Sequence, residues 1–99
     1  MNRNGAAKGE NRVKPIRMFI LRGCPYCRSA LQWQDEWLRS NDAYRKIPLE
    51  IIDESEEYAI AKAHDYYLVP TWYVDGVKVH EGAATREIVR QVLERALEG

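Results

Sequence analysis

The strongest guide to the fold is an apolar run that ends at a glycine and passes at once into helical spacing. Residues 16–21 read IRMFIL, a length and composition that fit a buried strand. Gly23 breaks this run, and Pro25 suits the first turn of a helix, where its missing N–H costs nothing. Helical spacing continues through the apolar residues Ala30, Leu31, Trp33, Trp37 and Leu38. The sequence therefore predicts a strand that leads directly into a helix.

Further along the chain, the sequence predicts a second strand followed by a second helix. PLEIID, at residues 48–53, has the apolar and β-prone character of a strand. Asp53 and Glu56 then resemble a capping box, which predicts a helix over about residues 54–65. Acidic residues at its start and basic residues at its end would complement the helix dipole.

The last third of the chain predicts a β-hairpin and a final helix. Asp75-Gly76 is a strong signal for a two-residue turn, here between TWYV and VKV. A stripe of apolar side chains follows with helical spacing, in a helix entered near Thr85: Ile88, Val89, Val92, Leu93, Ala96 and Leu97. The predicted order is β-α-β-α-β-β-α.

This order predicts an α/β fold with a mixed four-stranded sheet and helices on both of its faces. The first two strands are joined through a helix, so we expect them to be parallel. The chain has 99 residues, enough for one domain. We expect residues 1–14 to form a disordered, basic tail and residues 15–99 to form the domain.

Composition restricts the classes of partner. Fifteen acidic and fifteen basic residues give no net charge, which argues against nucleic acid as the main partner. No apolar run approaches the roughly 18 residues that span a bilayer, so we expect no membrane partner. The polar N-terminus lacks the apolar segment of an export signal. We therefore expect a cytoplasmic protein, and a monomer.

Cys24 and Cys27, the only cysteines, stand at the predicted junction of strand and helix. The thiolate is the nucleophile in disulfide exchange, and the N-terminus of a helix favours the anion. Arg22 and Arg28 would favour it further. We therefore expect an exposed, attacking Cys24 with a pKa well below that of a free thiol. Cys27, one helical turn later, is expected to be buried and to resolve the mixed disulfide.

A metal site is the alternative interpretation of the same cysteines. Cys24, Cys27, His64 and His80 would supply four ligands, and an iron–sulfur or zinc module would use the two thiolates. A structural zinc site of this type usually has its two histidines three to five residues apart, whereas here they are much farther apart. The sequence therefore predicts no metal ligands, with a metal-binding module kept as an alternative.

Proline before a predicted central strand is a second signal for a site. In LVPTWYV, Pro70 fits the first position of the strand, and the Val69–Pro70 bond is a candidate for a cis peptide. Such a bond would present the amide and carbonyl of Val69 to an extended substrate. The alternative is a trans proline that only begins the strand. Tyr26, between the cysteines, is equally consistent with substrate contact and with simple exposure.

These features together resemble the glutaredoxins within the thioredoxin superfamily, over about residues 15–98. The resemblance rests on Cys-Pro-Tyr-Cys after an apolar strand, Val-Pro-Thr before a hairpin, and one last helix. It implies a thioredoxin fold with Pro70 in cis and packed against Cys24. It also implies a thiol-disulfide oxidoreductase that uses glutathione as reductant, acts on glutathione mixed disulfides or protein disulfides, and binds no cofactor. The expected substrate-binding residues are Arg22, Pro25, Tyr26, Val69, Pro70 and Gly82.

The sequence departs from the glutaredoxin pattern after the hairpin. Glutaredoxins have a glycine pair followed by acidic residues there, whereas this chain has HEGAATRE, with only Gly82 and no aspartate. That segment is more similar to the entry of the last helix of thioredoxins. Met18 stands where thioredoxins have a buried aspartate. We therefore expect weak glutathione binding unless Glu81 or Glu87 supplies a carboxylate, and the alternative is a thioredoxin-like protein disulfide reductase that does not use glutathione.

Overall fold

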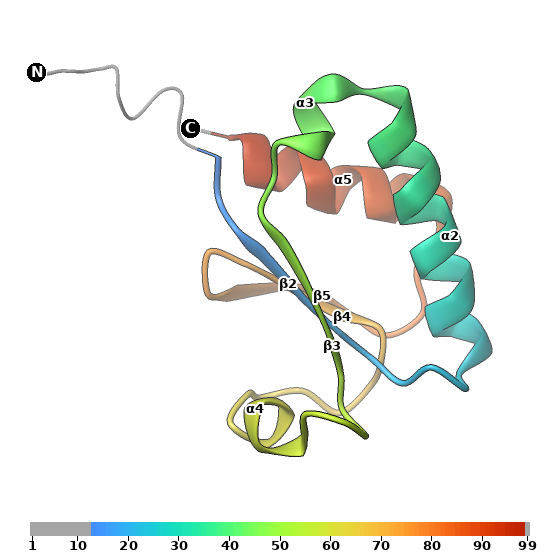
Figure 1. Cartoon of the computed structure of the whole chain (residues 1–99), viewed down its shortest axis with the longest axis vertical. Coiled ribbons are helices and arrows are strands. Elements are labelled where there is room, and N and C mark those ends of the chain that lie inside the picture. Colours follow the sequence, from blue (N-terminus) through green and yellow to red (C-terminus); the bar gives the residue numbers. More distant parts are fainter. Residues whose placement is uncertain (1–12, 99) are drawn as a thin grey trace, which may run out of the picture.

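Four strands form one mixed sheet in the order β3-β2-β4-β5 (Figure 1). The computed structural model describes residues 13–98. The strands are β2 (Ile16–Ile20), β3 (Leu49–Asp53), β4 (Thr71–Val74) and β5 (Val77–Glu81). The helices are α2 (Pro25–Ser40), α3 (Asp42–Arg45), α4 (Tyr58–Lys62) and α5 (Arg86–Leu97).

The parallel pair β2–β3 and the hairpin β4–β5 are as predicted, whereas the pairing of β4 with β2 was not predicted. β2 runs parallel to β3, while β4 is antiparallel to both β2 and β5. The turn between β4 and β5 is the Asp75-Gly76 dipeptide, whose φ angles of 52° and 81° lie in the left-handed region that such hairpins require. The prediction of a mixed four-stranded sheet is confirmed.

Alternate side chains of β2 enter two separate cores. Ile16, Met18 and Ile20 join the larger cluster with side chains of α2, α3 and α5. Phe19 points to the other face and packs in a smaller cluster on the side of α4. Figure 1 shows α4 on the opposite side of the sheet from the other helices. Helices therefore cover both faces of the sheet, as predicted.

The segment after β3 differs from its prediction. Instead of a helix over residues 54–65, residues 54–56 form a turn and α4 covers only five residues. Asp53 does not cap that helix, because its carboxylate accepts hydrogen bonds from the Ser55 amide (2.9 Å) and hydroxyl (2.6 Å). This local turn competes with helix formation, which delays the start of α4.

Smaller differences occur at the other boundaries. β2 ends at Ile20 rather than at residue 21, and β3 begins at Leu49, one residue after the proline. The short helix α3 was not predicted; Asn41 caps it by accepting a 2.9 Å hydrogen bond from the Ala43 amide.

The predicted tail lies mainly outside the described residues, which begin at Val13. Val13 packs against the larger core, and the Lys14 amide donates a 2.8 Å hydrogen bond to the carbonyl of Ala96. Residues 13 and 14 therefore contact the domain. Within residues 13–98, no helix is long and apolar enough to cross a membrane.

Candidate active site

Cys24 is the residue from which α2 starts. Its backbone is extended, with φ −83° and ψ 124°, and Pro25 follows as the first helical residue. The Cys24 amide donates a 2.9 Å hydrogen bond to the Leu21 carbonyl, which closes the short loop after β2. The Cys24 carbonyl accepts from the Arg28 amide at 3.1 Å and so begins the helix. The strand-to-helix junction predicted from the sequence therefore places the first cysteine at the positive end of α2.

The two cysteines differ in their surroundings. Both are free thiols, Cys24 being partly exposed and Cys27 completely buried in the larger core. The Cys27 sulfur accepts a hydrogen bond from the Leu21 amide at 3.4 Å. Cys24 is therefore the sulfur that a substrate can reach, while Cys27 lies behind it.

The more exposed thiol, that of Cys24, also has the lower pKa of the two. The backbone amide of Cys27 lowers the pKa of the Cys24 thiol, against the effect of desolvation, and the Tyr26 amide and the Arg28 guanidinium lower it further. Burial raises the pKa of the Cys27 thiol to about 11. Cys24 is thus the more acidic of the two thiols, while Cys27 stays a neutral thiol at neutral pH.

The two arginines that flank the motif have different roles. Arg28 contributes to the low Cys24 pKa, as expected. Arg22 forms an ion pair with Asp53, with its Nε 3.4 Å from the carboxylate. That carboxylate is almost buried, whereas the Arg22 side chain remains largely exposed. Arg22 therefore ties the cysteine loop to the end of β3, and its role as a substrate ligand stays a prediction.

Pro70 lies at the same end of the sheet as the cysteine loop. Thr71 pairs with Phe19 across β4 and β2, which places Pro70 level with the end of β2. The Val69–Pro70 peptide bond is cis, and Pro70 is fully buried. The carbonyl of Pro70 accepts a 2.7 Å hydrogen bond from the Gly82 amide.

Gly82 has a conformation that suits glycine, with φ at 95°. A Cβ atom there would stand 3.3 Å from the Leu68 side chain. Gly82 thus allows the chain after β5 to pass close to the segment that precedes Pro70. The structure places Gly82 beside Pro70, while its predicted contact with a substrate stays a prediction.

Large exposed side chains lie in the first turn of α2 and on the segment before Pro70. Tyr26 is 62% exposed, Leu68 60% and Tyr67 90%, so three large side chains remain in contact with solvent. A hollow of about 410 Å³ lies on the α4 side of the sheet, where Tyr58, Ala61 and Tyr66 are among its lining residues; it reaches Leu21 but neither cysteine.

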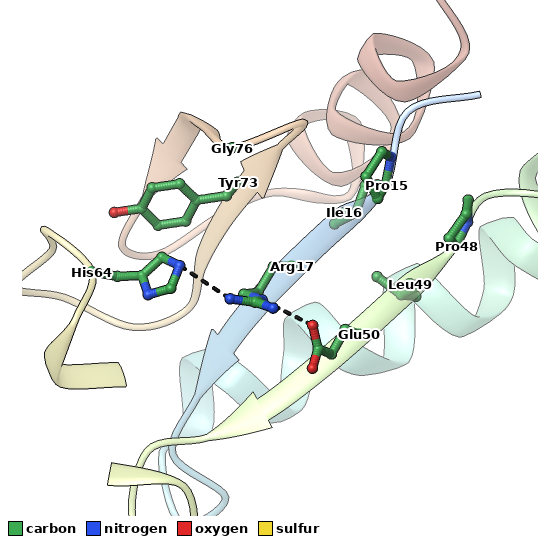
Figure 2. Close-up of a pocket in the computed structure, with 9 residues that line it drawn as sticks. All are labelled: Pro15, Ile16, Arg17, Pro48, Leu49, Glu50, His64, Tyr73 and Gly76. Carbon is green, nitrogen blue, oxygen red and sulfur yellow. Dashed lines mark hydrogen bonds and ion pairs between the residues drawn. The ribbon is translucent and has the colours of Figure 1, made fainter. Parts of the chain in front are cut away.

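A larger hollow, of about 610 Å³, lies on the sheet away from the cysteines and contains none of the predicted site residues. Figure 2 shows Arg17 across it, between Glu50 and His64. The His64 Nδ1 lies 2.9 Å from the Ile60 carbonyl, and its Nε2 lies 3.3 Å from the Arg17 guanidinium. Both contacts are satisfied when Nδ1 carries the proton and Nε2 accepts.

Among residues 13–98, no three His, Cys, Asp or Glu side chains are grouped in a way that would hold a metal ion. His64 packs against Phe19 and Tyr73 on the α4 face of the sheet. His80 packs against the Trp72 ring and contacts the Ala83 carbonyl at 3.0 Å. The described residues thus give the alternative set of two cysteines and two histidines no common site.

One group close to Pro70 was not recognised from the sequence. The carboxylate of Glu81 accepts hydrogen bonds from the amides of Tyr67 (2.6 Å) and Leu68 (2.9 Å). The sequence suggested Glu81 only as a partner for glutathione. No local pattern indicates this contact, because the bonded residues lie 13 and 14 positions apart in the chain.

Comparison with known proteins supports the fold. No family model and no curated protein matches the chain. Among solved structures, a mutant thioredoxin from Halobacterium salinarum NRC-1 is similar, with a TM-score of 0.65 and 21% identity over 92% of this chain and 80% of that one. The oxidised thioredoxin from Plasmodium falciparum also has a TM-score of 0.65, with 17% identity over 92% of this chain and 91% of that one.

The predicted fold class is therefore confirmed: the chain has the thioredoxin fold. Within it, Cys24 and Cys27 form a Cys-x-x-Cys pair at the start of α2.

Proposed function

We propose that this protein is a thiol-disulfide oxidoreductase that works through Cys24 and Cys27. The observation that carries the proposal is the asymmetry of the pair: an accessible thiol of lowered pKa begins α2, and a buried thiol of raised pKa stands one turn behind it. A redox pair needs one sulfur that attacks and one that resolves. The thioredoxin-like fold supports the same activity.

The reaction follows from these positions. The Cys24 thiolate attacks one sulfur of a substrate disulfide, forming a mixed disulfide and releasing the other substrate sulfur as a thiolate. Cys27 then gives up its proton and attacks the Cys24 sulfur, which releases the second substrate thiolate and leaves a Cys24–Cys27 disulfide. The substrate gains two electrons and the cysteine pair loses them. Two molecules of an external thiol restore the dithiol and become a disulfide themselves.

We propose glutathione as that external thiol, with glutathione mixed disulfides and protein disulfides as substrates. Two features support it: the resemblance of Cys-Pro-Tyr-Cys to glutaredoxins, and the arginines beside the pair, which suit an anionic tripeptide. Its binding should be weak. Glu81 is engaged by two backbone amides and Lys78, and Glu87 by Arg90, so an ammonium group would have to compete with these contacts for either carboxylate.

A protein disulfide reductase that does not use glutathione is the second candidate. It is favoured by the similar structures, both thioredoxins, and by the thioredoxin-like segment from Gly82 to Glu87. For either function we propose a cytoplasmic monomer that needs no bound cofactor and binds neither nucleic acid nor membrane.

Reduction of the oxidised protein separates the two candidates. The oxidised protein is offered glutathione with glutathione reductase in one assay, and thioredoxin reductase in another, with NADPH consumption as the readout in both. We expect faster reduction by glutathione. Turnover with thioredoxin reductase alone would replace glutathione dependence with the second candidate. No reduction by either system, and no disulfide reductase activity of the dithiol form, would overturn the oxidoreductase itself.

A further inference from the structure

The side chain of Glu81 connects β5 to the chain that leads into Pro70. One carboxylate oxygen accepts the amides of Tyr67 (2.6 Å) and Leu68 (2.9 Å), and the other accepts from the ammonium of Lys78 at 2.7 Å. Lys78 and then the two amides lower the pKa of Glu81 from 4.5 to about 2. The group is therefore an anion with fixed partners at any physiological pH.

Other contacts fasten the rest of this segment. The carbonyl of Asp65 accepts from Lys78 at 3.0 Å and from the Tyr73 hydroxyl at 2.8 Å. The Leu68 carbonyl accepts from the Thr71 hydroxyl. The segment from residue 65 to residue 68 is thus held at several points against β4 and β5.

Val69 is the exception within this segment. In the part of the chain that the structure describes, neither its amide nor its carbonyl has a hydrogen-bond partner. Its neighbours on both sides are fixed, Leu68 through Glu81 and Thr71, and Pro70 through the Gly82 amide. An unpaired amide and carbonyl beside a reactive cysteine loop suit the backbone of an extended peptide.

We propose that Glu81 is a positioning residue for the exchange reaction, holding Tyr67 and Leu68 so that the Val69 backbone is presented to an extended peptide substrate. The inference rests on the proposed function and names its preferred substrate class: disulfides within a peptide chain. A small disulfide has no peptide backbone and so cannot form these backbone hydrogen bonds with Val69. Glu81 should therefore matter for peptide disulfides and not for small ones.

The test compares Glu81→Gln with wild type on two substrates, a cystine-bridged peptide and hydroxyethyl disulfide. Glutamine keeps the shape of the side chain but loses its charge, and a hydrogen bond to a charged group is the stronger kind. We expect KM for the peptide to rise about tenfold, with kcat for the peptide and all constants for hydroxyethyl disulfide within about twofold of wild type. Glu87→Gln, which removes a surface carboxylate paired with Arg90, serves as the control and should change neither substrate.

Two results would overturn the inference. An unchanged KM for the peptide would show that Glu81 does not position the substrate. An equal loss on both substrates would show that Glu81 only supports the fold. Wild type inactive on both substrates would instead refute the proposed function, so the two failures are distinguishable.

Hydrogen exchange gives a readout that does not depend on activity. Followed by NMR, the amides of Tyr67 and Leu68 should exchange about tenfold faster in Glu81→Gln than in wild type, whereas the Gly82 amide should keep its rate. Unchanged exchange at Tyr67 and Leu68 would mean that the carboxylate does not hold the segment, and would overturn the inference whatever the kinetics.

Discussion

At the scale of single residues, the start of α2 acts on its two sulfurs in opposite directions. Cys24 lies just before the helix, where unpaired backbone amides favour a negative charge. Cys27 lies inside the first turn and faces the core, where burial disfavours any charge. Two cysteines only three positions apart therefore differ in acidity, Cys24 being the attacking thiol and Cys27 the resolving one. This difference in acidity leads to two predictions.

Replacing each cysteine by serine should separate attack from resolution. Cys24→Ser removes the accessible thiol of the pair and leaves only the buried one, so we expect it to lose all exchange activity. Cys27→Ser keeps the attacking thiolate and should retain activity on glutathione mixed disulfides, where a second glutathione replaces Cys27. Activity of both variants on a glutathionylated peptide, measured with glutathione reductase, checks this. Activity in Cys24→Ser together with none in Cys27→Ser would reverse the assigned roles.

The pH dependence of alkylation should follow the two acidities. Because the pKa of Cys24 is lowered from 9.0, its thiolate persists as the pH falls below that value. The rate of iodoacetamide reaction should therefore reach half its plateau below pH 9.0, with one thiol modified per chain. Cys27, with a pKa raised to about 11, should react only after unfolding. Two equivalents modified in the native protein at neutral pH would contradict the buried position of Cys27.

At the scale of elements, short sequence signals predicted the helix starts and turns correctly where no other local hydrogen bond competed with them. Gly23 and Pro25 placed the start of α2, and Asp75-Gly76 placed the hairpin, since each depends on a few adjacent residues. The predicted helix over residues 54–65 was wrong because Asp53 has two local uses. If Asp53 capped a helix, that helix would begin directly after it. Instead, the Asp53 carboxylate accepts hydrogen bonds from Ser55, and α4 begins only at Tyr58.

The same reasoning explains which parts of the candidate site the sequence could reveal. Cys24 and Cys27 were recognised because their chemistry depends on a local junction, and Val69-Pro70 because proline stands out before a strand. Glu81 was missed as a structural group because its contacts cross from β5 to a distant loop. The partner of Arg22 was missed for the same reason: Asp53 meets it only when β2 and β3 pair.

The predicted start of the last helix near Thr85 is confirmed, and the contribution of Thr85 to stability can be tested directly. The Thr85 hydroxyl accepts a 3.1 Å hydrogen bond from the Ile88 amide and so caps the helix. Thr85→Ala should lower the free energy of unfolding by about 1 kcal/mol, whereas Thr85→Ser, which keeps the hydroxyl, should stay close to wild type. Urea denaturation of the three proteins measures the difference. Equal losses in both variants would assign the effect to the methyl group and not to the cap.

At the scale of the whole molecule, the sheet separates two cores of unequal size. The larger lies under α2, α3 and α5 and contains thirteen buried residues, Cys27 among them. The smaller is covered by α4, only five residues long, and contains four: Phe19, Ile52, Ala61 and Tyr73. Because a short helix with few buried contacts opens at low cost, the two faces should differ in local stability. The resolving cysteine belongs to the more stable face.

Native-state hydrogen exchange should reveal this difference. We expect the Ala61 amide in α4 to exchange by local opening, at a free energy well below that of global unfolding and little affected by urea. The Leu93 amide in α5 should exchange only through global unfolding. Ala61→Gly should lower the opening free energy of α4 by about 1 kcal/mol, the usual cost of glycine in a helix.

Opening of α4 need not disturb the active site, although α4 leads into the segment before Pro70. Glu81 and Lys78 fasten that segment to β5, so the Val69 backbone should stay in place when α4 opens. We therefore expect Ala61→Gly to keep the wild-type KM for a peptide disulfide, in contrast to Glu81→Gln. A rise in KM equal to that of Glu81→Gln would mean that α4 itself holds the segment. Equal exchange free energies for Ala61 and Leu93 would mean that the two faces unfold as one unit.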